Sequence, residues 1–305
     1  MHGADLKESV LLRCNLKGAN LTESRLHHTV LDQCIAVGAV FIRAFMGTAK
    51  ALKCDMTSAD LREANLTVAS FLESDLTRAN LAEALLDRTS VLECKLAEAQ
   101  FAGATIKQAA VMQTDLTTAA LAGARFETAV LIGSKLAGMK LAGINLAGTQ
   151  FMNSDLSNCD LTGANLLACN FKDANLEGAR LDNAQARNAL FIGAKLGKAS
   201  LRGAMLFQSL FIGADLSEAN CATANMYQCM LMQSRCVGTG FQGAELTYAD
   251  FSNADVSDGD FTGATLTRTK FHEAKMERAR WSASRADALG NDAEQSEADK
   301  WRPVY

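Results

Sequence analysis

A five-residue period governs nearly the whole chain. A large apolar residue, called the centre below, recurs at every fifth position from Leu6 to Trp281, which makes 56 consecutive units without an insertion or deletion. The residue two places before each centre is small, except in the units that hold Met139 and Ile144 there. Smaller centres stand at Ala36, Ala51, Ala186, Cys221 and Cys236. Any fold of this chain must give side chains five positions apart the same environment.

A period of five fits neither a flat strand nor an α-helix. In a strand an odd period sends successive centres to opposite faces. In a helix five residues advance the direction by about 140°, so that the centres would spiral around the axis. A chain that turns one corner per unit can point every centre, and every small residue two before it, into a shared interior. Repeat solenoids are built in this way.

The outward positions predict how many units make one turn. Large apolar residues directly after a centre recur mainly at a spacing of twenty, as Leu12, Leu52, Leu72, Leu92, Met112, Ile132, Met152, Ile192, Ile212 and Met232. Four units therefore form one coil, and the 56 units form about fourteen coils. The centres Phe171, Phe191 and Phe211 share this spacing, so their rings are expected to stack from coil to coil.

The repeat resembles that of the pentapeptide-repeat family over at least nine-tenths of the chain. Its clearest stretch runs from Phe151 to Arg180, where Asp or Asn stands before the centres, as in Asp155-Leu156, Asp160-Leu161 and Asn165-Leu166. The resemblance implies an all-β fold, a right-handed quadrilateral β-helix. We expect this solenoid to occupy residues 1–286 and a C-terminal cap or tail to occupy residues 287–305.

Composition narrows the classes of protein to consider. The one proline, Pro303, lies outside the repeat, as expected where backbone N–H groups are needed for pairing between coils. No run of about twenty apolar residues is present, and no basic start precedes an apolar block. The nine cysteines all fall on inward positions, which favours packing over metal binding and indicates a reducing compartment. We therefore expect no metal, no cofactor and a cytoplasmic location, or delivery by a secretion route that needs no signal.

The two ends of the repeat lead to different expectations. Ala4-Asp5-Leu6 is already in frame, so either something covers the first coil, such as a second copy, a partner or an upstream domain, or Met1 to Asp5 fray over its edge. At the other end Trp281 is a centre large enough to close the core. Asp292 and Gln295 are spaced like a capping box, which predicts a short helix in 291–300, folded over the last coil and anchored by Trp301. The alternative is a disordered tail.

One coil departs from the pattern. Its centres shrink to Ala36 and Ala51, while large residues occupy outward positions. Either a bulge or short helix distorts the register locally and buries them, or they form a hydrophobic girdle at which another element docks. In the second case they are a possible second contact: Ile35, Val37, Val40, Ile42 and Phe45.

Outward apolar residues are densest between Leu190 and Met232. There both neighbours of a centre are apolar on one face, and the preceding face carries large residues as well. Residues after the centre on the other faces are mostly Thr, Ala, Ser, Lys and Glu, so a general preference of strands for aliphatic residues is the weaker explanation. We predict that a partner binds at Leu190, Ile192, Met205, Phe207, Leu210, Ile212, Tyr227, Met230 and Met232.

The sequence indicates an interaction protein and no enzyme. His27 and His28 are outward without a ligand-spaced neighbour, and no phosphate loop, catalytic triad or zinc signature is present. The partner is expected to be another protein or a second copy, with a homodimer formed by coil ends or faces, and no direct contact with nucleic acid. The family resemblance admits a bacterial secretion-system accessory or effector carrier.

Two other functions stay open. The family resemblance also admits a DNA mimic that inhibits a type II topoisomerase such as gyrase. A mimic requires a strongly acidic face, whereas 30 basic and 34 acidic residues alternate along this chain. A third hypothesis is association with a membrane surface through the apolar face.

Overall fold

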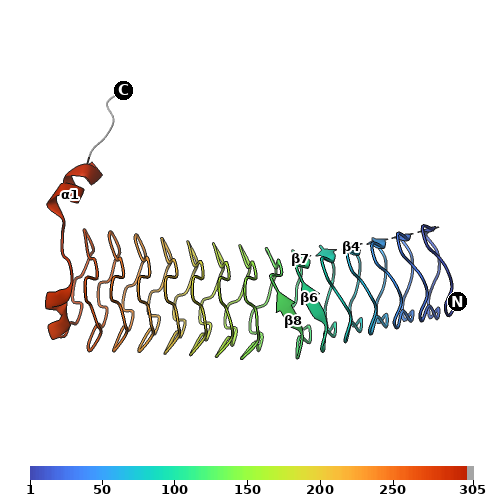
Figure 1. The fold of residues 1–305 in the computed structure, drawn as a ribbon, viewed down its shortest axis with the longest axis horizontal. Helices are drawn as coiled ribbons and strands as arrows, with labels where there is room; N and C mark the ends of the chain where they lie inside the picture. Colours follow the sequence, from blue (N-terminus) through green and yellow to red (C-terminus); the bar gives the residue numbers. More distant parts are fainter. Residues whose placement is uncertain (301–305) are drawn as a thin grey trace, which may run out of the picture. The chain divides into compact units, whose positions relative to one another are not determined.

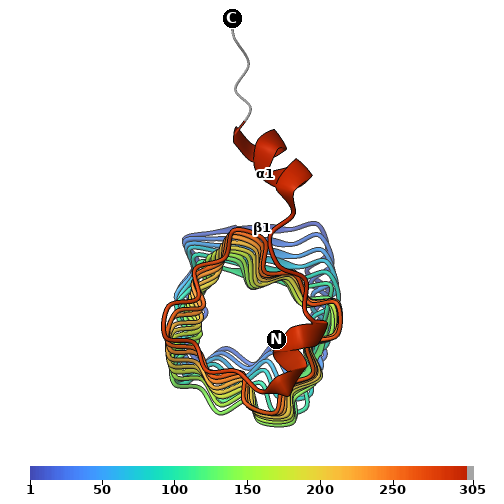
Figure 2. The same ribbon diagram turned by 90° about the vertical axis from the view of Figure 1, so that its left-hand side faces the viewer.

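Residues 1–300 are described by a computed structural model, in which each group of four units closes into one coil (Figures 1 and 2). Contacts divide the chain into a first unit, Met1–Met139 with Ile144–Asp155, and a second unit, Lys140–Gly143 with the chain from Leu156 onward. In both units parallel bridges join residues twenty apart, from Asp5↔Arg25 in the first to Asp260↔Arg280 in the second. The predicted quadrilateral β-solenoid is confirmed.

Strands are three residues long because each unit ends in a corner. One parallel sheet in the first unit takes a strand from each of six successive coils, in the order β1 (Val10–Leu12), β2 (Val30–Asp32), β3 (Lys50–Leu52), β4 (Ser70–Leu72), β5 (Ser90–Leu92) and β7 (Ala110–Met112). A second sheet pairs β6 (Thr105–Lys107) with β8 (Arg125–Glu127). In the second unit single bridges take the place of strands up to Arg280.

The interior holds the centres and the small residues two before them. Both positions are buried in nearly every unit from Leu16 to Phe271. In the second unit the ring of Phe191 stacks on Phe171 at 5.0 Å and on Phe211 at 4.7 Å between centroids. The predicted stacking is therefore present in this unit, and it explains why the residue two before the centre is small, because one large side chain per unit fills the coil.

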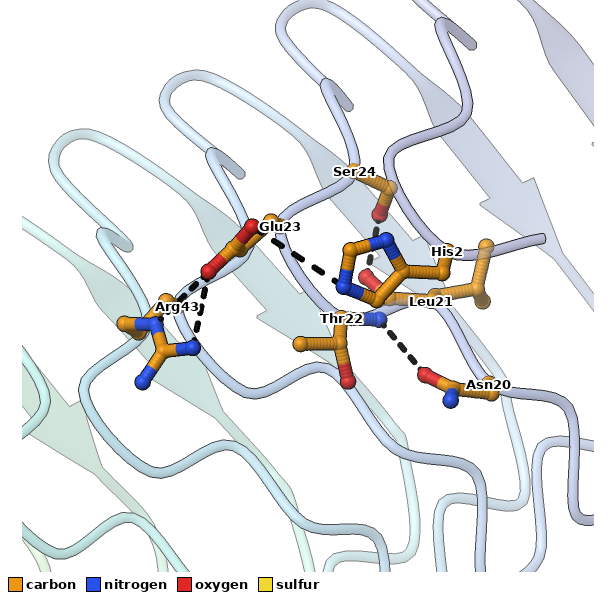
Figure 3. A network of polar contacts seen from close by, with 7 residues as sticks. All are labelled: His2, Asn20, Leu21, Thr22, Glu23, Ser24 and Arg43. Carbon is orange, nitrogen blue, oxygen red and sulfur yellow. Dashed lines mark hydrogen bonds and ion pairs between the residues drawn. The ribbon is translucent and has the colours of Figure 1, made fainter.

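The backbone conformation at the corners and the preference for Asp or Asn before the centre are explained by different local interactions. The residue two after the centre has positive φ whether it is glycine, as Gly163 at 64°, or not, as Asn158 at 56°. This left-handed backbone is costly for residues with a Cβ, and inter-coil bonds such as Asn158 N–H to Glu177 O at 2.9 Å hold it in place. An Asp or Asn before the centre accepts the N–H two residues on, as Asn20 does from Thr22 at 3.0 Å (Figure 3).

The coil around residues 35–51 is regular. Ile35, Val40 and Phe45 each bridge to the residue twenty positions later, and the small centres Ala36 and Ala51 remain buried. The distortion hypothesis is therefore wrong. The outward hydrophobic girdle is the arrangement that the structure contains.

Two helical segments follow the last repeat. Trp281 stacks on Phe261 at 4.5 Å, and in the 3₁₀ helix η1 (Ala283–Asp287) the Ser284 hydroxyl donates to Ala264 O at 2.6 Å. Helix α1 (Ala293–Lys300) confirms the predicted helix, and Asp292 Oδ1 accepts the N–H of Gln295 at 3.1 Å.

The position predicted for this helix was wrong. The bonds of α1 and its cap to the coil run to the outer side, from Ser296 Oγ to Glu273 Oε1 at 2.8 Å and from Asp292 N–H to His272 Nδ1 at 3.1 Å. The sequence AEQSEADK gives α1 no apolar face to lay on the core, so Trp281 and η1 cover the last coil instead. Trp301, the predicted anchor, lies outside the described residues.

Candidate protein-interaction face

An aliphatic stripe runs along one face of the second unit. It consists of the outward neighbours of the buried centres Phe191, Phe211 and Leu231, namely Leu190, Ile192, Leu210, Ile212, Met230 and Met232. Bridges Leu190↔Leu210 and Leu210↔Met230 set these residues directly above one another. Met230 is 40% exposed and the others are half-buried against their neighbours. The stripe ends at Asn170 on one side and at Asp250 on the other.

An aromatic ladder occupies the face that precedes the stripe. Phe207 and Tyr227 stack at 5.2 Å with ring planes 5° apart, and Tyr248 meets Tyr227 edge-on at 5.8 Å. The guanidinium of Arg187 lies 5.2 Å from the Phe207 ring centroid, and that of Arg268 lies 5.7 Å from the Tyr248 centroid. Cation–π contacts therefore close both ends of the ladder.

Sequence reasoning missed three members of this ladder. Arg187 stands twenty residues before Phe207 and could have been found from the period. Tyr248 stands 21 residues after Tyr227, at a corner with φ of 60°, and so it leaves the register that the apolar pattern follows. Arg268 lies twenty after Tyr248, and no apolar signal marks it.

A polar corner separates the stripe from the ladder. Gln208 Nε2 donates to Gln228 Oε1 at 3.0 Å along this corner. Met205 lies on the ladder side, half-buried and bridged to Asn225. The nine residues predicted as one contact thus form two apolar surfaces on the two adjacent faces that the sequence pattern indicated.

The predicted second contact is distributed around its coil. Ile35, which is 48% exposed, and Val37 flank the centre Ala36, Val40 and Ile42 flank the next centre, and Phe45, 45% exposed, lies on a third face. The Phe45 ring faces His27 at 6.3 Å. A flat partner would reach at most two of these faces, so the structure does not bring the five residues together as one site.

Family models match most of the sequence. Pentapeptide repeats (8 copies) match residues 1–35, 54–91, 74–109, 129–166 and 169–206, and a pentapeptide repeat region matches residues 204–281. The chain belongs to the pentapeptide-repeat family.

Solved structures of family members are similar at low identity. A trypsin-treated form of QnrB1, a plasmid-mediated fluoroquinolone resistance protein, is 18% identical over 70% of this chain and 97% of its own, with a TM-score of 0.43. HetL, a pentapeptide-repeat protein involved in heterocyst differentiation regulation in Nostoc sp. strain PCC 7120, is 23% identical over 86% and 89%, with a TM-score of 0.25. No curated protein matches by sequence. Similarity at this level carries no information on what the present chain binds.

Some of the charges on this pentapeptide-repeat chain are paired between coils. Arg43 contacts Glu23 at 2.7 Å, and His2 lies 3.9 Å from the same carboxylate (Figure 3). One column of residues before the centre alternates in sign, as in the bridges Lys195↔Asp215 and Asp215↔Arg235. Such alternation provides no continuous acidic face along this column, and it does not favour the DNA-mimic hypothesis.

Local bonds keep several carboxylates of the repeat ionised. The Thr162 hydroxyl donates to Asp160 Oδ1 at 2.6 Å and, with the Thr162 N–H, lowers the pKa of Asp160. Arg62 does the same for the pKa of Asp60, through bonds of 2.7 to 3.1 Å. These carboxylates stabilise turns, and such bonds explain their shifted pKa values without a catalytic role.

The cysteines behave as buried apolar side chains. None of the nine, all of them among the described residues, forms a disulfide, and all but Cys14 are buried. Burial raises the pKa of Cys54 and Cys94 to about 11 and that of Cys229 to about 12, so these thiols stay protonated and poorly reactive at neutral pH. Across residues 1–300, no three His, Cys, Asp or Glu side chains are grouped so that they could hold a metal ion. In that same range, no helix has both the length and the apolar character that a membrane crossing requires.

Proposed function

We propose that this protein is a non-enzymatic interaction scaffold that binds a partner protein or a second copy of itself through the aliphatic stripe and the aromatic ladder. The observation that carries the proposal is the stripe, in which both neighbours of three successive centres are apolar. At other faces of the same coils these positions hold Lys195, Asp215 and Arg235. Apolar and aromatic anchors at a packed centre supply most of the energy of protein interfaces.

The test is a double substitution on the two surfaces. Ile212→Asp with Phe207→Ser leaves the buried centres intact, so the circular dichroism spectrum and thermal unfolding should change little. Association, measured as mass by light scattering or as partner capture by the tagged protein, should be lost. Ala222→Asp is the matched control, because it adds one carboxylate to an outward position of the same coil, away from the stripe.

The proposal would be contradicted if the unmodified protein is a monomer and captures no partner. So would an association that survives the double substitution. The expectation of a secretion-system accessory or effector carrier stays a prediction, which the identity of the captured partner would decide.

A further inference from the structure

We infer that the aliphatic stripe binds an acidic amphipathic segment of another protein, an inference that rests on the proposed interaction function and names the chemistry of its partner. The first observation is the local charge. Residues 183–214 contain Arg187, Lys195, Lys198 and Arg202 but no Asp or Glu, although the whole chain has a net charge of −4. The stripe begins inside this basic stretch.

The second observation is that three cations around the stripe form no ion pair in the part of the chain that the structure describes, whereas some cations further along the same unit do. In the same unit, Arg235 contacts Asp215 at 3.6 Å and Arg278 contacts Asp258 at 2.7 Å, each pair spanning one coil. Within the described residues, Lys172, Arg187 and Lys195 form no ion pair with a carboxylate. No carboxylate of the described chain neutralises their charge, and the guanidinium of Arg187 lies over the Phe207 ring.

These three cations surround one end of the stripe. Lys172 lies on the stripe face one coil before Ile192, while Arg187 and Lys195 stand on the adjacent faces across the two corners. Asp173 and, on the face of Lys195, Glu177 are the carboxylates at this end, which leaves an excess of one positive charge. At the other end Asp250 is already paired with Lys270 at 3.8 Å.

The geometry suits a short helix laid along the stripe. Coils repeat at about 4.8 Å, close to the helical pitch of about 5.4 Å, so apolar residues at i, i+3 or i+4, and i+7 meet successive rows. Carboxylates on the flanks of such a helix reach the cations beside the stripe. If a second copy laid its own stripe against this one, the carboxylate of that stripe, Asp250, would already be paired with Lys270.

Three synthetic peptides test the inference by fluorescence anisotropy with the full chain. All have about fourteen residues and the same leucines at helical spacing, and the remaining positions are Glu, Gln or Lys. The Glu peptide should bind about tenfold more tightly than the Lys peptide, and salt should reduce this difference. Arg187→Gln with Lys195→Gln should weaken the Glu peptide about threefold, and Ile212→Asp should abolish its binding.

The matched control is Lys198→Gln with Arg202→Gln. It removes two cations of the same stretch, one at the far corner of the Lys195 face and one on the face opposite the stripe, and it should leave the affinity unchanged. The inference is overturned if the Lys peptide binds as tightly as the Glu peptide, or if both double variants lose affinity equally. Self-association that Ile212→Asp removes, without binding of the Glu peptide, overturns it and leaves the proposed function standing. The inference is also overturned if the protein sediments with phosphatidylserine vesicles and the Glu peptide does not displace it from them.

Discussion

The two units have the same types of residue at their inward positions and different types at their outward positions. Phe71 in the first unit and Phe191 in the second are equivalent centres, with exposed fractions of 2% and 0%. Their outward neighbours differ, because Ser70 precedes Phe71 whereas Leu190 precedes Phe191. The fold is therefore set by inward positions that the units have in common, and binding specificity is free to reside in the outward ones.

The pairing of charged side chains also differs between the two units. In the first unit Lys95 contacts Asp75 at 3.2 Å and Lys53 contacts Glu73 at 3.5 Å. In the second, Lys195 occupies the position equivalent to Lys95 and, in the part of the chain that the structure describes, forms no ion pair. A cation paired within the chain serves the repeat, and an unpaired one next to an apolar stripe is available to a partner.

The strongest test of the shared interior is a pair of equivalent cavities. Phe71→Ala and Phe191→Ala should each lower the free energy of unfolding by about 3–5 kcal/mol, because each empties a buried site between neighbouring coils. Ile192→Ala, on the half-buried stripe, should cost about 1 kcal/mol. Urea unfolding followed by circular dichroism measures all three. If Phe191→Ala costs no more than Ile192→Ala, the inward assignment of the centres is wrong.

In both units the buried thiols should lower the free energy of unfolding at high pH, by less than the two cavities do. Unfolded thiols ionise near pH 8.5, whereas burial raises the folded pKa of Cys54 to about 11 and that of Cys229 to about 12. The unfolded state then loses protons that the folded state keeps, so stability is full below pH 8.5 and is lost as pH rises toward the folded pKa. Each thiol should cost about 2 kcal/mol by pH 10.5.

Alanine variants isolate this contribution. Cys54→Ala and Cys229→Ala place the residue that most other units already hold there, and each should reduce the loss of unfolding free energy between pH 8 and pH 10.5. Cys14→Ala, at a partly exposed site, is the control. An unchanged pH dependence in both buried variants would show that these thiols ionise freely in the folded protein.

The sequence predicted the fold because the repeat itself determines burial. Each centre has one inward direction, and each corner recurs at a fixed offset, as Gly163 and Gly203 show with φ of 64° and 61°. The C-terminal segment has no period, and a capping box specifies where α1 starts but not which surface it contacts. Its actual neighbours, His272 and Glu273, are polar residues with no distinguishing sequence signal.

The candidate site was only partly predictable for a related reason. The spacing of twenty identified the stripe from Leu190 to Met232. Tyr248 lies at a corner outside that register, and its edge-on contact with Tyr227 depends on side-chain direction. The pairing of these cations follows the residue one coil before them. Lys95 stands twenty residues after Asp75 and pairs with it, whereas Lys195 stands twenty residues after Asn175, so the spacing of twenty could have distinguished the two.

The smallest expected effect on stability tests the difference in pairing between Lys95 and Lys195. Lys95→Gln should lower the free energy of unfolding by about 0.5 kcal/mol, because it removes an exposed ion pair with Asp75, whereas Lys195→Gln should change it by less than about 0.2 kcal/mol. The difference in unfolding free energy between the two variants should disappear in 1 M salt, which screens the exposed ion pair. Urea midpoints at low and high salt measure it. Equal losses from the two variants would mean that Lys195 also has a partner within the chain, and the basic end of the stripe would no longer be available to an acidic ligand.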